Sequence, residues 1–400
     1  MLRAGTFALT VLLAALTAIG PLTTDMYLPS LPDIARQLGA TTAQAQLTIS
    51  SYLLGFAGAQ IFYGPLSDRH GRKPVLMSAL IIYAAATLAC TLSTSIEMLI
   101  VARAVQGCGG AGGIVLSRAI VRDLYSGARA GREMSLIASV MALAPVLAPL
   151  AGGVLQAGIG WRSVFVTLLI AGAAIAMAIW LLLPETNVKR AAEPFSLRSM
   201  IGSYAVLARS RAYLAYLGLG ALSFAGLFAW ISGSSFVLQD LYGLSPFAFG
   251  AAFAVGSVGY MFGAALSARL VPRLGLDRMI GVGTCCCTLG GLGMVAALAL
   301  GLTSALSLVL PMSVYLAGMG MVLGQSVAGA MTPFPERAGA ASSLFGVCQQ
   351  STAAVCGAVV GVLLGKSAWP LALAVAMMGS ASLVLWLATR RLRRAAAAGR

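Results

Sequence analysis

Two charged residues stand inside apolar stretches of the sequence, where an ionised side chain is energetically costly. Asp25 is the one acidic residue placed in the interior of a run long enough to span a membrane, and Arg103 is the one such cation. Burial in hydrocarbon favours the protonated form of a carboxylate, so Asp25 is suited to bind and release a proton. Arg103 keeps its proton, but its charge can bias a neighbouring carboxylate. The two residues therefore predict a site of proton coupling.

Each residue also has a structural interpretation that the sequence leaves open. Asp25 lies near the end of its apolar run, so it can instead be wetted by a cavity mouth or cap a helix break before Pro29. Arg103 can instead satisfy the carbonyl groups of loops or helix ends. The two residues lie at comparable depth when about 1.5 Å of rise is counted per residue, which permits direct or water-mediated coupling. Asp33 is expected to be a loop residue.

The elements that must position these residues are apolar stretches of membrane-spanning length. Of the 400 residues, 59% are hydrophobic and 9% are charged, whereas soluble domains carry about 25% charged residues. This composition excludes a water-soluble enzyme or binding module. Runs near the roughly 20 residues that cross a bilayer recur along the chain and predict an all-α polytopic membrane protein with twelve transmembrane helices. The expected spans are residues 7–28, 43–66, 74–94, 96–117, 133–157, 161–183, 212–235, 246–270, 279–300, 304–331, 341–364 and 367–389.

The positive charges are distributed unequally between alternate loops. If the N-terminus lies in the cytosol, only Arg36, Arg162 and Lys366 of the 26 Lys and Arg residues fall on the opposite side. Cytosolic loops of membrane proteins are enriched in Lys and Arg. Both termini are therefore expected in the cytosol, and a bacterial inner membrane is the expected location. The net charge of +15 predicts this topology and not a nucleic-acid surface.

The longest polar gap divides the expected spans into two sets of six. This gap, residues 184–211, predicts a cytosolic linker with room for a short surface helix. The predicted domains are a six-helix bundle at 1–183, a second six-helix bundle at 212–389 and a basic cytosolic tail at 390–400.

The two halves resemble each other where their second and third spans meet. Arg69 and Gly71 in the first half recur as Arg273 and Gly275 in the second half. Internal repeats of this kind are typical of transporters that bind substrate between their halves. Pro272 stands where the second copy would have Asp, which predicts weaker charge interactions in the second loop.

Four short segments also carry a family resemblance. Segments Gly64–Lys73 and Arg103–Gly107 resemble the loop signature and the R-x-x-Q-G element of the major facilitator superfamily. Segment Ala144–Gly153 resembles the G-P-x-x-G-G element of its exporters, with Ala148 in place of a glycine, and Thr24–Pro29 resembles the signature of its bicyclomycin-resistance/CflA drug-efflux branch. The resemblance implies the major facilitator fold and drug:proton antiport, with Asp25 as the coupling residue.

The resemblance assigns a conformational role to the segment between the second and third spans. Gly71 permits a tight turn, while Asp68 can accept hydrogen bonds from a neighbouring helix N-terminus or pair with an arginine across the bundle. Such contacts are expected to latch the cytosolic end closed, with plain topology signalling as the alternative. The latch residues are Gly64, Asp68, Arg69, Gly71, Arg72 and Lys73.

Prolines and glycines in the fifth span predict a hinge. Proline removes a helix hydrogen bond and glycine permits close helix contact, so a kinked and tightly packed segment is expected. The hinge residues are Pro145, Pro149, Gly152 and Gly153. The glycine run of the fourth span, which includes Gly107 and Gly113, is likewise expected to let neighbouring helices approach.

A cavity for drug-like compounds combines apolar and aromatic walls with a few polar groups. Residues of this kind occur in several spans, and each can instead pack against lipid or a neighbouring helix. The candidates are Tyr52, Gln60, Gln106, Met141, Phe224, Phe228, Tyr315, Gln325 and Gln349.

These features predict proton-coupled efflux of drug-like or small metabolic compounds by alternating access of two bundles. The sequence contains no phosphate-binding loop, so the proton gradient is the expected driving force. The expected partners are a small-molecule substrate, protons and the lipid bilayer, with no enzyme activity, cofactor, metal or nucleic acid, and the expected state is a monomer. Two alternatives stay open: a proton-coupled uptake symporter for a small metabolite, and a non-transporting membrane receptor or subunit.

Overall fold

The computed structural model describes residues 6–125, 127–187, 197–334 and 337–393, and these residues contain helices and no strand. The chain folds into two compact units. The first comprises residues 1–195 with 245–250, and the second comprises residues 196–244 with 251–400. The change from one unit to the other at 195–196 falls within the polar gap of the sequence.

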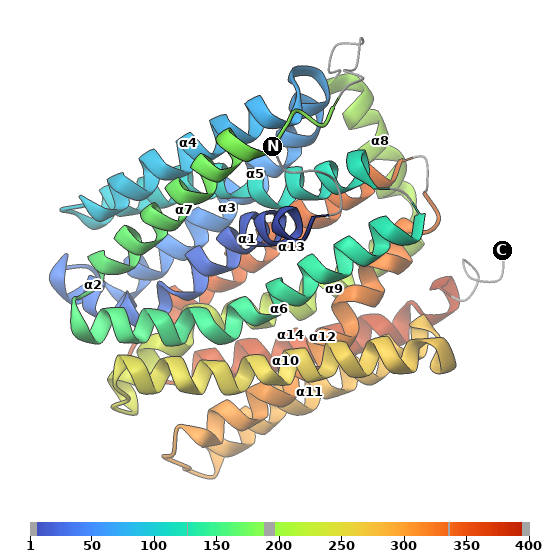
Figure 1. The fold of residues 1–400 in the computed structure, drawn as a ribbon. Coiled ribbons are helices and arrows are strands. Elements are labelled where there is room, and N and C mark those ends of the chain that lie inside the picture. The colour runs from blue at the N-terminus through green and yellow to red at the C-terminus, as the bar shows by residue number, and fades with distance from the viewer. Residues whose placement is uncertain (1–5, 126, 188–196, 335–336, 394–400) are drawn as a thin grey trace. The chain divides into compact units, whose positions relative to one another are not determined.

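The first unit holds seven of the described helices (Figure 1). A 3₁₀ turn at Leu28–Ser30 joins the first two of them. The helices are α1 (Phe7–Asp25), α2 (Leu31–Gln37), α3 (Thr42–His70), α4 (Arg72–Thr91), α5 (Ile96–Leu124), α6 (Gly127–Gly158) and α7 (Arg162–Leu182).

The second unit opens with the short helix α8 (Leu197–Arg209), which packs against α9 and α13. A π-helical turn at Val237–Leu241 follows α9. The remaining helices are α9 (Arg211–Phe236), α10 (Pro246–Leu274), α11 (Leu276–Ala299), α12 (Leu306–Met331), α13 (Ala338–Leu363) and α14 (Trp369–Ala388), and the first turn of α10 belongs to the first unit.

Each of the twelve expected spans corresponds to one long helix, which confirms the all-α fold with twelve membrane helices. Eleven helices of the described chain are long and apolar enough to cross a membrane. The helix outside this set is α3, whose sequence carries Gln44, Gln46, Ser50 and Ser51. Gln46 and Ser50 are buried, so α3 keeps part of its polar surface within the protein instead of facing lipid.

Single glycines make the two sharpest connections of the fold. Gly71 alone separates α3 from α4, and Gly275 alone separates α10 from α11. Both glycines have a positive φ, 100° and 79° respectively, which L-residues rarely adopt. The tight turn predicted at Gly71 is therefore present, and its counterpart in the sequence repeat has the same geometry.

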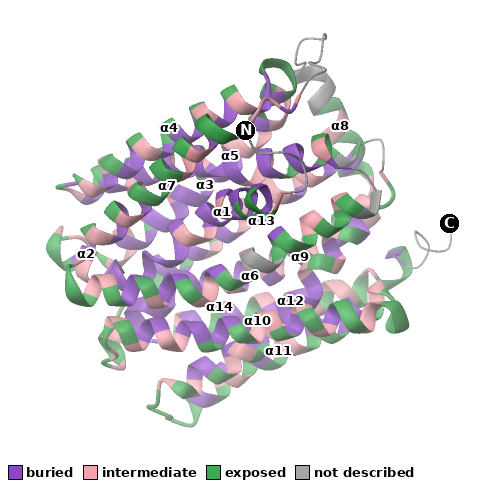
Figure 2. Ribbon diagram, in the orientation of Figure 1, coloured by how far each residue is buried: buried purple, intermediate pink, exposed green. Residues whose placement is uncertain are grey.

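Burial is distributed as expected for helices surrounded by lipid (Figure 2). Large apolar side chains such as Ile81, Val101, Ile170 and Phe262 are more than half exposed. Water would penalise so much exposed apolar surface, whereas hydrocarbon does not. Polar side chains such as Thr23, by contrast, are buried inside their own unit.

Candidate functional site

Asp25 is the last residue of α1 and lies inside the first unit. It is 6% exposed, and its helix gives way directly to the turn that leads to Pro29. Within the described part of the chain, no hydrogen bond or ion pair engages its carboxylate. Tyr52 of α3 lies near enough to interact with it electrostatically. The carboxylate is thus buried without a fixed partner, which is unusual for an acidic side chain.

A close contact between α1 and α6 fixes the backbone beside Asp25. Gly152 of α6 packs against the main-chain carbonyl of Met26, and a side chain at position 152 would overlap that carbonyl. The helix stays continuous through Pro145 and Pro149. The expected tight packing is therefore present at Gly152, whereas the expected kink stays a prediction. Movement about a hinge stays a prediction.

Arg103 of α5 is fully buried and is held between two aromatic rings. Its guanidinium carbon lies 4.7 Å from the centroid of the Tyr27 ring and 4.5 Å from that of Tyr52, within the range of cation–π attraction. Its Nη1 donates to the Thr23 carbonyl oxygen at 3.3 Å, and its Nε donates to the Thr48 carbonyl oxygen at 3.4 Å. The role of satisfying main-chain carbonyls, which the sequence left open, is therefore present.

No ion pair joins Asp25 to Arg103. The guanidinium instead donates to Gln106 Oε1 at 2.7 Å, and its Nη2 has no partner in the described structure. Tyr52 connects the two residues indirectly, because its ring packs on Arg103 and it interacts electrostatically with Asp25. Direct pairing is absent from this structure, and indirect coupling stays a prediction.

A chain of hydroxyl and amide groups extends from Arg103 toward α4. Gln106 Nε2 donates to Thr87 Oγ1 at 2.8 Å, and the hydroxyls of Thr23 and Tyr83 lie 2.7 Å apart. Sequence reasoning missed these hydroxyl residues, because threonine and tyrosine are common in membrane helices. The sequence offered one signal for these groups: Thr23 and Tyr27, two hydroxyl residues, stand two positions before and two positions after Asp25.

The glycine run of α5 lets three helices pack closely against α5. Gly107 packs on the α3 backbone at Tyr52, and Gly113 packs on the α1 backbone at Leu16. Gly109 packs on the α4 backbone at Tyr83. The prediction that these glycines permit close helix contact is confirmed.

The segment between α3 and α4 forms a compact set of charge contacts. Arg72 opens α4, and its Nε donates to Asp123 Oδ2 of α5 at 2.8 Å. Arg72 also donates to Asp68 and, at 2.7 Å, to the hydroxyl of Ser67. Asp68 thus pairs with Arg72, four residues further along the chain, and not with an arginine across the bundle as the sequence allowed. Arg69 is exposed, and the space beside Gly64 is open.

The carboxylate that caps the N-terminus of α4 comes from a residue that sequence reasoning did not single out. Glu185 follows α7, and its two oxygens accept hydrogen bonds from the main-chain N–H groups of Arg72 at 2.8 Å and Lys73 at 3.1 Å. The other role considered for Asp68, capping a helix N-terminus, therefore belongs to Glu185. Negative charge at this position also complements the helix dipole. The sequence placed Glu185 in a linker and so offered no reason to expect it here.

The second unit contains its own buried charge pair. Arg393, whose side chain is fully buried, donates through Nε to Asp277 Oδ1 at 2.7 Å. Asp277 lies in the first turn of α11, two residues after Gly275. The second loop thus lacks an acid at position 272, but a different acid, Asp277, forms a charge pair with Arg393. The sequence treated Arg393 as part of a basic tail, of which residues 394–400 lie outside the described chain.

The cavity candidates of the first unit differ in their surroundings. Tyr52 and Gln106 are buried and hold Arg103, as described above. Gln60 Oε1 is buried and has no partner in the described structure. Met141 is half-buried. Contact of these four residues with a substrate stays a prediction.

The cavity candidates of the second unit include an aromatic pair and two residues bound to neighbours. The rings of Phe224 and Phe228 lie 4.9 Å apart on α9. The Tyr315 hydroxyl donates to the Ser223 carbonyl oxygen at 3.1 Å, and Gln325 Nε2 donates to Ser267 Oγ at 3.2 Å.

In Gln349, the fifth of these candidates, the buried amide nitrogen Nε2 lacks a partner among the described residues. Its contact with a substrate, like that of Phe224, Phe228, Tyr315 and Gln325, stays a prediction.

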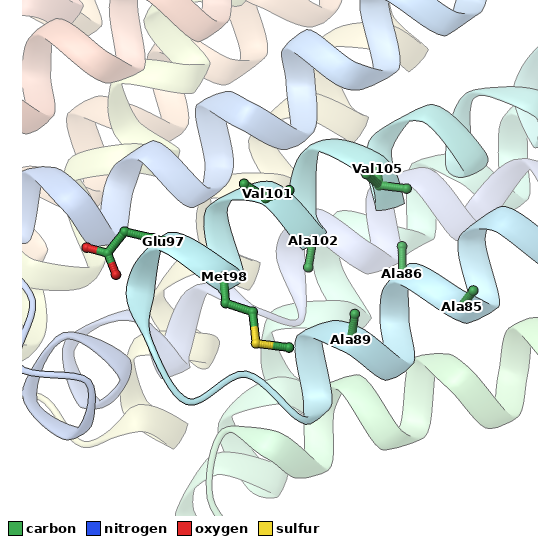
Figure 3. A pocket seen from close by; sticks show the side chains of 8 residues that line it. All are labelled: Ala85, Ala86, Ala89, Glu97, Met98, Val101, Ala102 and Val105. Atoms are coloured by element: carbon green, nitrogen blue, oxygen red, sulfur yellow. The ribbon is translucent and has the colours of Figure 1, made fainter.

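A groove between α4 and α5 contains none of the cavity candidates (Figure 3). The groove has a volume of about 590 Å³ and is open to the outside. Small alanines of α4 and apolar side chains of α5 line it. Val101, for example, is 64% exposed. A groove of this character faces lipid, and only Glu97 at the start of α5 adds charge to it. The lining residues are Ala85, Ala86, Ala89, Glu97, Met98, Val101, Ala102 and Val105.

Comparison with known proteins gives matches along nearly the whole chain. The sequence profile of the Major Facilitator Superfamily matches residues 13–357. The multidrug resistance protein D of Escherichia coli is 32% identical over 95% of each chain. The bicyclomycin resistance protein homolog of Haemophilus influenzae is 31% identical over 92% of each chain. A chloramphenicol resistance protein of Pseudomonas aeruginosa is 30% identical over 91% of this chain and 86% of its own.

Solved structures support the same fold. The crystal structure of a peptide transporter POT in complex with sulfate matches with a TM-score of 0.75 at 17% identity, over 98% of this chain and 97% of its own. A bacterial homolog of the human lysosomal transporter Spinster matches with a TM-score of 0.67 at 18% identity, over 97% of each chain. At this identity the likeness concerns the fold alone.

Proposed function

The chain belongs to the Major Facilitator Superfamily, and from this premise we propose that it exports drug-like compounds in exchange for protons. The superfamily consists of transporters and not of enzymes, and this chain is a multi-pass membrane protein. Three of its relatives are named for resistance to multiple drugs, bicyclomycin or chloramphenicol, which supports drug-like compounds as substrates. The resemblance to the bicyclomycin-resistance branch, first seen at Thr24–Pro29, agrees with these names.

The observation that carries this proposal is the buried, unpartnered carboxylate of Asp25. No hydrogen bond or ion pair in the described structure holds this carboxylate in one protonation state. It can therefore take up and release a proton without breaking a fixed contact. In the proposed cycle, Asp25 takes up a proton from the outside and releases it to the cytosol, and a bound drug promotes release. Alternating access of the two halves keeps the two events on opposite sides.

The proposal includes the orientation and the state of the protein. The excess of Lys and Arg in alternate loops supports cytosolic termini in a bacterial inner membrane. The α3–α4 end then faces the cytosol. The charge contacts described there lie within the first unit, so they stabilise this end of the half, and the latch expected from the sequence would need further contacts with the other half. The protein works as a monomer, needs no cofactor and draws its energy from the proton gradient.

Drug-coupled proton movement in everted membrane vesicles tests the proposal. Vesicles that carry the protein are acidified inside, and chloramphenicol or bicyclomycin is then added. Antiport predicts that the drug enters and the pH gradient partly collapses. Asp25→Asn should abolish this response, because an amide cannot exchange a proton at this site. Asp33→Asn is the matched control. Asp33 lies in α2 and not in the loop that the sequence predicted. Its carboxylate is already hydrogen-bonded to Gln37 and Gln156, so this variant should respond like the wild type.

The alternatives give different results in the same vesicles. Uptake by symport predicts that a substrate added outside the everted vesicles leaves their pH gradient unchanged. A receptor or subunit predicts no drug flux with any compound. Drug-driven collapse of the gradient in Asp25→Asn at the wild-type rate would exclude Asp25 as the proton carrier.

A further inference from the structure

The first unit contains a set of contacts that joins the end of α7 to the start of α4, two helices that pack side by side (Figure 1). Glu185, which follows α7, accepts the main-chain N–H groups of Arg72 and Lys73 in the first turn of α4. A second contact joins the same two helices: the Lys73 side chain of α4 donates through Nζ to the main-chain carbonyl oxygen of Trp180 in α7 at 2.8 Å. We name this set, Glu185 with Arg72, Lys73 and Trp180, the first clasp.

Two neighbours of Glu185 extend the first clasp to the rest of the α3–α4 end. Thr186 Oγ1 donates to Asp123 Oδ2 at 3.2 Å. Asn187 Nδ2 donates to the Asp68 carbonyl oxygen at 2.9 Å, at the last turn of α3. The segment after α7 therefore binds three helix ends. These are the start of α4, the last turn of α3 and the end of α5, where the contact is Asp123, the acid that pairs with Arg72.

The second unit contains the corresponding set of contacts between α14 and α11, which also pack side by side. Arg393, which follows α14, donates to Asp277 in the first turn of α11 at 2.7 Å and to the Trp386 carbonyl oxygen at 2.7 Å. The indole Nε1 of Trp386 donates to the Asp277 carbonyl oxygen at 3.1 Å. We name this set, Asp277, Trp386 and Arg393, the second clasp.

The two clasps occupy equivalent positions of the repeat with reversed charges. Lys73 and Asp277 each stand two residues after the glycine that precedes their helix. In the first clasp the helix start supplies the cation, Lys73, and the main-chain N–H groups that the acid of the segment after α7, Glu185, accepts. In the second clasp the helix start supplies the acid and the segment after α14 supplies the cation. In both, a cation binds the main-chain carbonyl of a tryptophan.

Burial separates the second clasp from ordinary surface charges. The Arg393 side chain is 0% exposed and that of Asp277 is 29% exposed, whereas Arg390 and Arg391 on the same short helical segment are exposed. A buried guanidinium is strongly destabilising unless its charge and its N–H groups are matched. Arg393 is matched by a carboxylate and two further oxygens, so its position is specific.

We propose that Glu185 and Arg393 are positioning residues for transport, which tie α7 to α4 and α14 to α11 so that each half moves as one body. Alternating access by rocking requires that helices within a half keep their mutual positions while the halves separate. If α4 and α7, or α11 and α14, shift relative to each other at one end, the half no longer moves as one body and its substrate site moves less. The inference deepens the proposed function and rests on it for the transport measurement only.

Variants of the second clasp test the proposal in the full chain reconstituted in liposomes. Arg393→Ala should lower the thermal midpoint by roughly 5 °C or more and speed hydrogen exchange in the first turn of α11. It should also lower the turnover rate for chloramphenicol about ten-fold at unchanged KM, because remote misplacement slows a step without weakening binding. Arg391→Ala, an exposed neighbour, is the control and should match the wild type in every measurement.

A conservative variant and a charge exchange separate positioning from mere loss of stability. Arg393→Lys keeps the charge but cannot reach all three acceptors, so it should fall between the wild type and Arg393→Ala. The exchange of Asp277→Arg with Arg393→Glu restores an ion pair and should recover part of the turnover rate that either change alone removes. Glu185→Ala should speed hydrogen exchange at Arg72 and Lys73. Its control is Glu97→Ala, which removes an exposed acid from the first turn of α5 and should leave that exchange unchanged.

Three outcomes would overturn the proposal. The thermal midpoint and the hydrogen exchange of α11 could be the same in Arg393→Ala as in Arg391→Ala. This would show that the second clasp does not hold α14 to α11. A lowered midpoint with unchanged turnover would reduce both residues to a structural role. Failure of the charge exchange to recover any turnover would exclude a pairwise contact. If the wild type transports no compound, the proposed function fails, whereas exchange and midpoint still decide whether the clasps hold their helices.

Discussion

At the scale of single residues, the candidate site combines Asp25, the proposed proton carrier, with the charge of Arg103, which several contacts hold in place. Arg103 is bound to two main-chain carbonyls and to Gln106, and two aromatic rings cover it, so its position does not depend on Asp25. Any influence on the Asp25 carboxylate must then act through the electric field and through Tyr52, which interacts with both. A site of this kind can be weakened by removing the residue that anchors the charge.

Gln106→Ala tests this anchoring. The change leaves Arg103 Nη1 short of its nearest acceptor and Thr87 Oγ1 without its donor. Loss of a buried hydrogen-bond partner costs about 1–3 kcal/mol. We expect a lower thermal midpoint in detergent and slower drug-coupled proton movement. Gln60→Ala is the control, because the Gln60 carbonyl is unpartnered in the described structure, and it should change the midpoint less. Equal effects of the two changes would contradict the anchoring role.

The sequence identified the charged members of the site and not the polar groups around them. Asp25 and Arg103 were found because a charge in an apolar run is rare and costly. Thr23, Thr87 and Tyr83 were missed, because hydroxyl side chains are ordinary in such runs and only the helix packing reveals where they point. Glu185 was missed for a different reason: its partners are main-chain N–H groups 112 and 113 residues away in the sequence.

At the scale of helices, close packing at glycines determines where the charged residues lie. Gly152 lets α6 pack directly on the Met26 carbonyl beside Asp25, and Gly107 lets α5 pack directly on the α3 backbone at Tyr52. The apolar runs predicted the helices well, because length and hydropathy set the spans. The ends were predicted less well: α3 continues to His70, so only Gly71 remains of the expected loop. Helix ends depend on contacts such as the Glu185 cap, which hydropathy does not contain.

Gly152→Ala tests the contact between α6 and α1. An added methyl group would overlap the Met26 carbonyl, so the two helices must separate. Overpacking of this kind costs about 1–3 kcal/mol. We expect a lower thermal midpoint and a loss of drug-coupled proton movement, because Asp25 adjoins Met26. Gly131→Ala on the same helix has open space around it and should leave the midpoint unchanged or raise it. A wild-type midpoint in Gly152→Ala would exclude the contact.

At the scale of the whole molecule, the proposed exchange gives each transport cycle a defined electrical consequence. Asp25 is the one acidic residue placed in the interior of an apolar run, which predicts one proton per cycle. Exchange of one proton for an uncharged drug moves one net charge across the membrane. Exchange of one proton for a singly charged cation moves none.

Imposed membrane potentials test this stoichiometry in liposomes that carry the protein. A potassium gradient with valinomycin should accelerate proton-coupled transport of uncharged chloramphenicol and should leave that of the monovalent cation ethidium unchanged. The energy available is about 2.3 kcal/mol per charge at 100 mV, enough for a change in rate that is easily measured. Acceleration of both compounds, and of chloramphenicol more than ethidium, would indicate a second proton per cycle, and acceleration of neither would contradict antiport through Asp25.

The reversed polarity of the two clasps has a consequence for the history of the chain. Two copies of one ancestral half begin with the same charges at these positions, yet Lys73 and Asp277 now carry opposite signs. The two contacts also differ in kind, because Glu185 accepts main-chain N–H groups whereas Arg393 pairs with a side-chain carboxylate. Grafting the segment after α14 onto the first half would therefore be unfavourable, because it would set a guanidinium against the N-terminal amides of α4. Chimeras that join the halves of two relatives should therefore be cut so that each helix start keeps the end segment with which it evolved.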